Sequence, residues 1–244
     1  MKKSAFILLF AIVLASCTSK PEQKPTVVYT EDGTPEVIKK DTSVIVMADM
    51  PVHIDSTEFL VHPVGELQLY QSKGKFWSSA SSYDGRSSYE NTNFTISSYT
   101  NYNFTGNLRN LQFEQLGTDK LVPLTDKNIR ISSAQFLSDL YKREGKQLFF
   151  YTITDADTNK DGALDYKDIE TLYMSKIDGS NFVKLTPNNQ ELIDWKIIDS
   201  INRIYFKTLE DVNKDGNFDR KDKVHYHYIN LLDKVLKPIE YYPI

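Results

Sequence analysis

The sequence predicts an all-β protein built from antiparallel, four-stranded repeats. Its 15 Tyr and 13 Phe residues, together with many Thr, Ile and Val, favour strands. From residue 43 onwards, short apolar runs alternate with turn signals, and no long segment has a convincing helical period. A strand–turn–strand pattern also recurs in the second half. The chain of 244 residues is long enough for a sizeable core in one domain or two small ones.

Residues 1–16 have the pattern of a lipoprotein signal peptide. Lys2 and Lys3 precede an apolar run at 6–13 that is too short for a membrane span. The run ends in Leu-Ala-Ser-Cys, which resembles the bacterial lipobox and implies lipidation of Cys17. The alternative is an ordinary signal peptide with an incidental cysteine. Cys17 is the only cysteine in the sequence, so no disulfide can form within the chain.

The residues after Cys17 predict where the chain is anchored. Several acyl chains on this cysteine would hold it stably in a membrane. Thr18 stands where an Asp would favour the inner membrane, so resemblance to the sorting rule of diderm bacteria implies the outer membrane, with the leaflet left open. The Pro-containing segment 17–40 is expected to be a flexible tether, and 41–244 the β-repeat domain. A formal net charge of −4 argues against nucleic acid and anionic membrane surfaces as partners.

The first third of the domain predicts a diverged unit. Segments 43–47, 57–61 and 66–70 are the expected strands. Segment 72–106, rich in Ser, Tyr, Asn and Gly, is expected to form a long loop or loose hairpin. Its aromatic residues could form a protein- or glycan-binding surface, or they could belong to a hairpin with one packed face. These aromatic residues are Tyr83, Tyr89, Phe94, Tyr99, Tyr102 and Phe104. The single helical candidate is 133–143, whose alternative is a strand followed by a loop.

The second half contains an internal repeat. Segments 111–125 and 172–186 align at an offset of 61 residues, and each predicts a strand, a polar turn and a strand ending in Leu-Thr. A looser copy occupies 224–238. Paired strands are expected before each acidic loop, at 129–136 with 148–153 and at 192–198 with 203–207. One unit therefore has the order strand, strand, acidic loop, strand, turn, strand.

Four antiparallel strands in each unit are typical of a β-propeller blade. The run at 172–186 resembles the repeat of TolB-type propellers, whose blades end in a similar Asp-Gly then Leu-Thr pattern, and the resemblance covers about 108–238. It implies a propeller-like domain. Two units are clear and one or two are degraded, whereas closed propellers usually have at least four blades, so closure is left open.

The two acidic loops, 157–168 and 211–222, share the pattern D-x-N-K-D-G-x-[L/F]-D-x-K-D. Oxygen side chains stand at positions 1, 3, 5, 9 and 12, Gly stands at position 6, and position 7 offers a backbone carbonyl. This spacing predicts two Ca²⁺ sites. The candidate ligands are Asp157, Asn159, Asp161, Ala163, Asp165 and Asp168 in the first loop, and Asp211, Asn213, Asp215, Asn217, Asp219 and Asp222 in the second.

The loops resemble the EF-hand loop, but their expected flanks are strands and position 12 is Asp. They resemble more closely the hairpin calcium loop of integrin-α propellers, in which the Asp at position 9 completes the site. This ranks Asp165 and Asp219 above Asp168 and Asp222 as direct ligands. The alternative is a solvated Asx/Gly turn without a metal. Magnesium prefers a tighter octahedron, so calcium is favoured.

Outside the loops the sequence offers little that predicts catalysis. His225 and His227 share one face of a strand and could form half of a zinc or copper site, or they could be surface or lining residues. No nucleophile, zinc-protease or phosphate-binding motif is present in the sequence. The sequence thus predicts a non-enzymatic, calcium-stabilised outer-membrane lipoprotein that presents a binding surface to an envelope protein or glycan. The alternative is an envelope-anchored hydrolase that uses clustered carboxylates.

Overall fold

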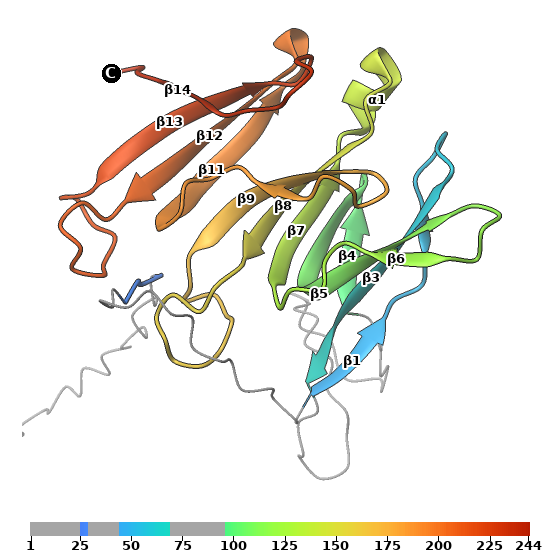
Figure 1. Cartoon of the computed structure of the whole chain (residues 1–244), viewed down its shortest axis with the longest axis horizontal. Helices are drawn as coiled ribbons and strands as arrows, with labels where there is room; N and C mark the ends of the chain where they lie inside the picture. Colours follow the sequence, from blue (N-terminus) through green and yellow to red (C-terminus); the bar gives the residue numbers. More distant parts are fainter. Residues whose placement is uncertain (1–24, 29–43, 69–95) are drawn as a thin grey trace, which may run out of the picture.

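The computed structural model describes residues 25–28, 44–68 and 96–244, and these form an antiparallel β structure with one short helix (Figure 1). The predicted signal peptide, Cys17 and most of the tether lie outside the described residues. Residues 25–28 belong to the segment predicted to be a tether, yet they lie in defined contact with both acidic loops. No helix among the described residues is long and apolar enough to cross a membrane.

The strands form two sheets. The larger sheet contains β1 (Val44–Ala48), β2 (Val52–His53), β3 (Phe59–Gln68), β4 (Ser97–Thr100), β5 (Asn103–Gln115), β6 (Leu121–Pro123), β7 (Arg130–Phe136), β8 (Leu148–Thr154), β9 (Glu170–Lys176) and β10 (Val183–Lys184). The smaller sheet contains β11 (Gln190–Ile198), β12 (Arg203–Glu210), β13 (Lys223–Asn230) and β14 (Ile239–Tyr241). A 3-10 turn, Asp199–Ile201, joins β11 to β12.

The repeat inferred from the sequence corresponds to real strand order. In the larger sheet, β7, β8, β9 and β10 follow one another as antiparallel neighbours, and β11 to β14 do the same in the smaller sheet. Each set contains an acidic loop between its second and third strands. The prediction of a mostly β, antiparallel structure is therefore confirmed, whereas the described sheets do not close and the β-propeller stays a prediction.

The separation of units into individual sheets is only partly as predicted. The last unit is a sheet of its own, whereas the two earlier units share one sheet of ten strands. The cause is β5, which changes partner along its length: Asn103–Leu108 pair with β7, and residues 112–114 pair with β6. The described sheets are open, with β1 at one end of the larger sheet and β11 and β14 at the ends of the smaller one.

Two local predictions need correction. Segments 57–61 and 66–70 were expected to be separate strands, but β3 runs continuously through Phe59–Gln68 and tolerates Pro63, because the strand needs only its carbonyl there, which accepts the N–H of Asp49. The helical candidate at 133–143 is a strand to Phe136 followed by α1 (Ser138–Glu144), which ends at Gly145 in a left-handed conformation.

All seven residues of β8 are buried, and its two faces pack into different cores. Phe149, Tyr151 and Ile153 pack on one side, into a core shared with β3, β5 and β7. Leu148 and Phe150 pack on the other side, against the smaller sheet. This explains why the strand is a continuous apolar run and does not alternate between apolar and polar residues.

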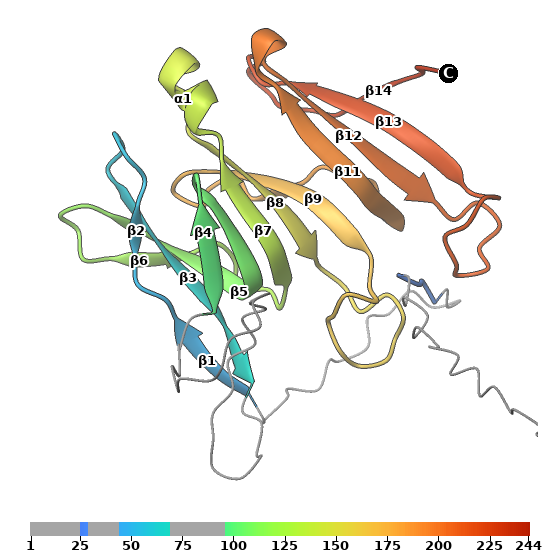
Figure 2. The ribbon, with the colours of Figure 1, turned by 180° about the vertical axis from the view of Figure 1, so that it is seen from behind.

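The second core joins the two sheets. Residues of α1, β8 and β9 meet Leu192, Ile204, Phe206 and Ile229 of the smaller sheet. Trp195 of β11 stacks on Phe150 with ring centroids 5.9 Å apart and donates a hydrogen bond to the hydroxyl of Thr152. Figure 2 shows the smaller sheet lying across one side of the larger one, with α1 at the end of the molecule opposite to both acidic loops.

Candidate calcium-binding loops

The two acidic loops occupy equivalent hairpins at the same end of the molecule (Figure 1). The first loop joins β8 to β9, above the paired residues Thr154 and Glu170. The second joins β12 to β13, above Glu210 and Lys223. The strand flanks predicted from the sequence are confirmed, so these are hairpin tips and not helix–loop–helix units.

Each loop is closed by a hydrogen bond from position 6 to position 1. The N–H of Gly162 donates to Asp157 Oδ2, and that of Gly216 donates to Asp211 Oδ2, both at 2.8 Å. Both glycines have φ of +84°, in the left-handed region that residues with a Cβ rarely adopt. The glycine at position 6 therefore makes the sharp turn that the sequence pattern predicted.

Positions 3 and 5 form two successive side-chain turns. In the first loop, Asn159 Oδ1 accepts the N–H of Asp161 at 2.9 Å, and Asp161 Oδ1 accepts the N–H of Ala163 at 3.0 Å. The second loop repeats both bonds with Asn213, Asp215 and Asn217. The N–H of position 7 stabilises the charged carboxylate at position 5, so the pKa values of Asp161 and Asp215 lie below their usual range.

The carboxylate at position 12 holds the loop together from inside. Asp168 is fully buried, and its oxygens accept the N–H groups of Thr158, Asn159 and Asp165 at 2.8, 3.2 and 3.0 Å. Burial raises its pKa against the effect of these donors. Asp222 plays the same part in the second loop, accepting from Val212 and Asp219. Both oxygens of each position-12 carboxylate are thus occupied by the backbone.

The carboxylate at position 9 accepts a backbone N–H through one oxygen. Asp165 Oδ1 accepts the N–H of Lys167 at 2.8 Å, and Asp219 Oδ1 accepts that of Lys221 at 2.7 Å. Each position-12 carboxylate, by contrast, accepts backbone N–H groups through both of its oxygens. The integrin-like ranking of Asp165 and Asp219 above Asp168 and Asp222 as direct ligands stays a prediction.

A lysine ammonium lies against the remaining oxygens of the first loop. Lys167 Nζ is 3.2 Å from Asp161 Oδ2 and 3.4 Å from Asp165 Oδ2. The ammonium thus supplies, beside the carboxylates of positions 5 and 9, the positive charge that a bound cation would supply. In the second loop, Lys221 is 3.9 Å from Asp219 Oδ2, a weaker version of the same contact.

The second loop contains an oxygen with no partner at all. Asp211 is 3% exposed, and its Oδ1 atom is buried without a hydrogen-bond donor. A buried carboxylate oxygen without a donor or a cation is costly, because ionised groups lose their hydration on burial. This orphaned oxygen belongs to position 1, the first ligand of the predicted site, so the residues present fit a cation here.

The apolar residue at position 8 anchors each loop, as the pattern predicted. Leu164 is 5% exposed and Phe218 is 7% exposed. Phe218 packs with Ile169, which follows the first loop, so the two loops share a small apolar cluster.

No three His, Cys, Asp or Glu side chains in residues 25–28, 44–68 and 96–244 gather tightly enough to make a ready metal centre. The loops combine carboxylates with amide and backbone carbonyl oxygens, and their carboxylates repel one another. Binding would therefore have to draw the oxygens of positions 1, 3, 5, 7 and 9 together.

His225 is held by two carboxylates, whereas the buried His227 has no hydrogen-bond partner at Nδ1. Both ring nitrogens of His225 contact carboxylates at 2.7 Å, Glu210 on one side and Glu240 on the other. His227 stacks on Phe206 with centroids 4.8 Å apart, and burial lowers its pKa. The histidines thus tie β12, β13 and β14 together, which agrees with the reading of them as lining residues.

The aromatic insert is described only from residue 96 onwards, so Tyr83, Tyr89 and Phe94 lie outside the described residues. Phe104 is fully buried, and Tyr102 packs edge-on against Phe136. Tyr99 is 40% exposed. From residue 96 onwards, β4 and β5 form a hairpin with one face packed. This arrangement is the second interpretation offered for the aromatic residues, in place of a recognition surface.

Glu191 is a perturbed carboxyl that the sequence did not single out. It lies on β11, and its Oε2 accepts the N–H of Glu170 at 2.8 Å. Burial raises the pKa of Glu191 to about 8, and the nearby charge of Glu170 acts in the same direction. The contact of β9 with β11, between the two sheets, creates this environment, and no spacing in the sequence signals it.

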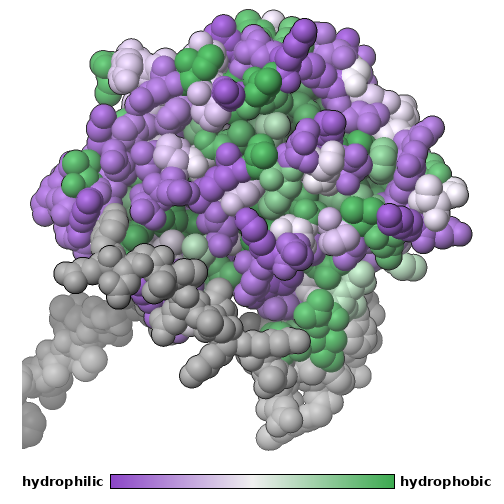
Figure 3. Space-filling model, viewed as in Figure 1, coloured by the Kyte–Doolittle hydropathy of each residue, from purple (hydrophilic) through white to green (hydrophobic). Residues whose placement is uncertain are grey.

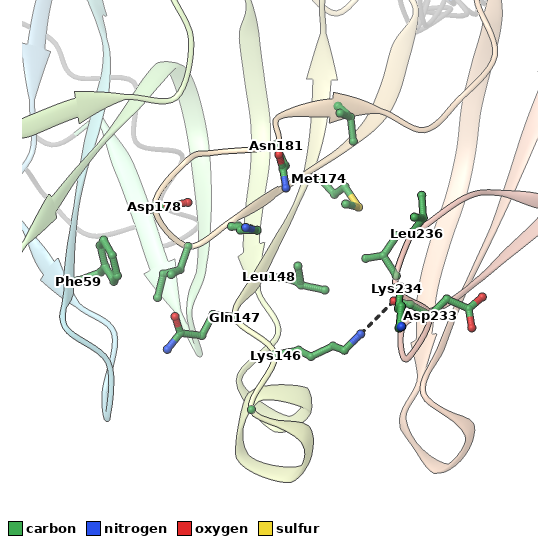
Figure 4. A pocket seen from close by; sticks show the side chains of 15 residues that line it. Phe59, Lys146, Gln147, Leu148, Met174, Asp178, Asn181, Asp233, Lys234 and Leu236 are labelled. Atoms are coloured by element: carbon green, nitrogen blue, oxygen red, sulfur yellow. Dashed lines mark hydrogen bonds between the residues drawn. The ribbon is translucent and has the colours of Figure 1, made fainter.

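A cavity of about 670 Å³ lies between the base of α1, the β9–β10 turn and the turn before β14. Figure 4 shows Leu148, Met174 and Leu236 facing it, with Lys146 at the edge donating to the carbonyl of Asp233 at 3.2 Å. In Figure 3, which has the orientation of Figure 1, apolar surface gathers in the upper middle of the molecule. This cavity lies at the end of the fold opposite to the acidic loops.

Comparison with protein-family models, curated proteins and solved structures finds no match for this chain. The functional interpretation therefore rests on the chemistry of the loops and on the predicted N-terminal signal.

Proposed function

We propose that this protein is a non-enzymatic, calcium-binding lipoprotein anchored by Cys17 to a bacterial outer membrane. Calcium is structural: it fixes the two hairpin tips of a β-propeller-like domain that presents a binding surface to an envelope protein or glycan. The calcium assignment depends on Asp211 Oδ1, which is buried without a hydrogen-bond donor at position 1 of the second loop. The first loop has the same hydrogen bond from position 6 to position 1.

The chemistry of the ion is electrostatic. Oxygens of positions 1, 3, 5, 7 and 9 would hold it, and its two positive charges would offset four carboxylates in each loop. The backbone hydrogen bonds within each loop orient the carboxylates, and Asp168 and Asp222 hold the loop ends together. This arrangement suits a structural staple, because both loops connect strands of rigid sheets.

The propeller-like part of the proposal rests on the repeated four-stranded unit and its resemblance to TolB-type blades. Successive units pack through shared apolar cores, as blades do. The number of blades and the closure of the ring are not needed for the calcium chemistry.

The binding-surface part draws on an aromatic face of the smaller sheet. Four half-buried tyrosines lie together there, with Arg203 4.5 Å from the ring centre of Tyr228. They are Tyr205, Tyr226, Tyr228 and Tyr241. Aromatic rings with polar tips suit contacts with proteins or sugars.

Calorimetric titration of the purified chain with Ca²⁺ tests the proposal. We expect two sites, one of which is lost in Asp211→Asn because that change removes a charge from position 1. Asp139→Asn, the same change on the exposed face of α1, should retain both sites. Absence of any calcium heat in the unmodified chain would overturn the proposal.

A further inference from the structure

Residues 25–28, here called the strap, bind the first acidic loop through its backbone. The N–H of Thr26 donates to the carbonyl of Lys167 at 2.9 Å, and the N–H of Val28 donates to the carbonyl of Thr158 at 2.6 Å. The hydroxyl of Thr158 donates back to the carbonyl of Thr26 at 2.9 Å. Three hydrogen bonds thus fix the strap to positions 2 and 11 of the first loop.

The same strap binds the second loop. The N–H of Val27, between the two residues just described, donates to the carbonyl of Gly216 at 3.0 Å. Thr26 also forms an isolated antiparallel bridge with Asn217. A Cβ at Gly216 would lie 2.4 Å from the carbonyl oxygen of Val27, so the two backbones are in close contact. Figure 2 shows the strap lying between the two loops.

The side chain of Val27 completes the junction. It is 7% exposed and packs with Ile169, which follows the first loop, and Phe218, which is position 8 of the second. Val28, by contrast, is 45% exposed. The strap is therefore held by acceptors and apolar groups that exist only while both loops keep their shape.

The strap's acceptors belong to the parts of the loops that a cation would fix. Gly216 is position 6 of the second loop, and Thr158 and Lys167 are positions 2 and 11 of the first. Each loop carries four carboxylates, whose mutual repulsion favours opening when no cation offsets it. Opening of a loop would move the carbonyls that the strap requires.

We propose that the strap docks across both loops when they hold calcium and releases when calcium is withdrawn. This inference rests on the proposed calcium binding and deepens it. Because one strap contacts both loops, it also couples the two sites. Calcium in either loop fixes the carbonyl groups that bind the strap, and the bound strap then helps to hold the other loop in its closed shape.

The consequence concerns the lipid anchor. Seven residues lie between Cys17 and Pro25, so a docked strap limits the reach of the chain to about 28 Å when fully extended. After release, 26 residues lie between Cys17 and β1, with a reach of about 90 Å. Calcium would thus hold the two loops close to the membrane, and its loss would let the domain move away.

Hydrogen exchange measured by mass spectrometry on the full chain tests the strap, with calcium calorimetry on the same sample. The amides of Thr26, Val27 and Val28 are all donors in the docked state, so we expect them to exchange roughly tenfold or more slowly in calcium than in excess chelator. Val27→Asn should abolish this difference and weaken calcium binding several-fold, because it removes the buried side chain without changing a loop residue. Val28→Asn, at the exposed neighbour, should preserve both.

The outcomes separate the two proposals. Equal exchange of the strap amides in calcium and in chelator, in a chain that binds calcium by calorimetry, would overturn the strap and leave the calcium function intact. Normal calcium affinity with a fully exchanging strap in Val27→Asn would overturn the coupling of the two sites. A chain that releases no heat with calcium would overturn both the proposed function and this inference.

Discussion

Single residues in the loops decide how the calcium sites would compare. The ammonium of Lys167 lies against Oδ2 of Asp161 and Oδ2 of Asp165, whereas Lys221 makes one longer contact, to Asp219, in the second loop. The two loops are nearly identical in sequence, yet the first has an internal cation that calcium must displace. The structure therefore predicts unequal affinities for twin motifs.

We expect Lys167→Met to raise the calcium affinity of the first loop by roughly three- to tenfold, because it removes a competing positive charge from the oxygens of positions 5 and 9. The matched change Lys221→Met should have a smaller effect on the second loop. Calorimetric titration at low and high salt measures both, and the gain should shrink as salt screens the lysine. Equal effects of the two substitutions would contradict this reading.

The twelve-residue pattern was enough to predict the residues of these loops, their glycine turn and their apolar anchors, because each follows from a fixed position. It could not predict that Asp211 Oδ1 would be buried without a donor, or that Asp168 would be fully buried. Both depend on what the folded chain packs over the loop, and part of that cover is the strap, more than 120 residues away in sequence.

At the scale of elements, the strands were predictable where apolar periodicity and turn signals coincide, as in β7, β8, β11 and β12. The sequence failed at β3, which runs continuously where two separate strands, 57–61 and 66–70, were predicted. It also failed at β5, which has one apolar pattern but pairs with β4 and β7 along its first half and with β3 and β6 along its second. Pairing partners are a tertiary property, because a strand's own pattern fixes its buried face and not its neighbour.

The junction of β9 and β11 predicts a pH dependence. The pKa of Glu191 is raised to about 8 in the folded protein, above the ordinary value of 4.5, so the folded state binds its proton more tightly than the unfolded state. Protonated Glu191 therefore contributes to the stability of the folded state in full below about pH 4.5, and this contribution is lost as pH rises towards 8.

Glu191→Gln removes this titration while keeping an oxygen that can accept the N–H of Glu170. We expect the variant to be more stable than the unmodified chain by roughly 1–3 kcal/mol at pH 9, with little difference at pH 5. Urea unfolding at several pH values measures the difference. A stability difference that does not vary with pH would show that the carboxyl is not desolvated in the folded state.

At the scale of the whole molecule, the two sheets are joined through one apolar core. Phe206 of β12 is 2% exposed and lies in the cluster that includes Leu172 of β9. We expect Phe206→Ala to cost about 3–5 kcal/mol, because it opens a cavity between the sheets. A single, cooperative unfolding transition at a lower temperature should result.

The control for this prediction is Ile193→Ala on β11, where the side chain is 45% exposed and the cost should stay below about 1 kcal/mol. Scanning calorimetry distinguishes the outcomes. Two separate transitions in Phe206→Ala, with the larger sheet unaffected, would mean that the sheets fold independently.

Calcium should stabilise the whole fold by mass action. At a concentration about 100 times the dissociation constant, each site adds about 2.7 kcal/mol, so two sites should raise the melting temperature by roughly 10 °C or more over the value in excess chelator. Asp211→Asn should reduce that rise by about half, and Asp139→Asn should leave it unchanged. The same melting curve with and without chelator would refute a structural role for calcium.

The sequence by itself determined the strand-rich class, the repeated unit and the oxygen spacing of the two loops. These are local properties, set by residue type and by separations of a few residues. Only the tertiary structure decided that two units share one sheet, that Glu191 is desolvated, and that residues 25–28 lie across both loops. Each depends on contacts between segments distant in sequence, where packing and the pairing of backbone hydrogen-bonding groups decide among arrangements that a local pattern leaves equally open.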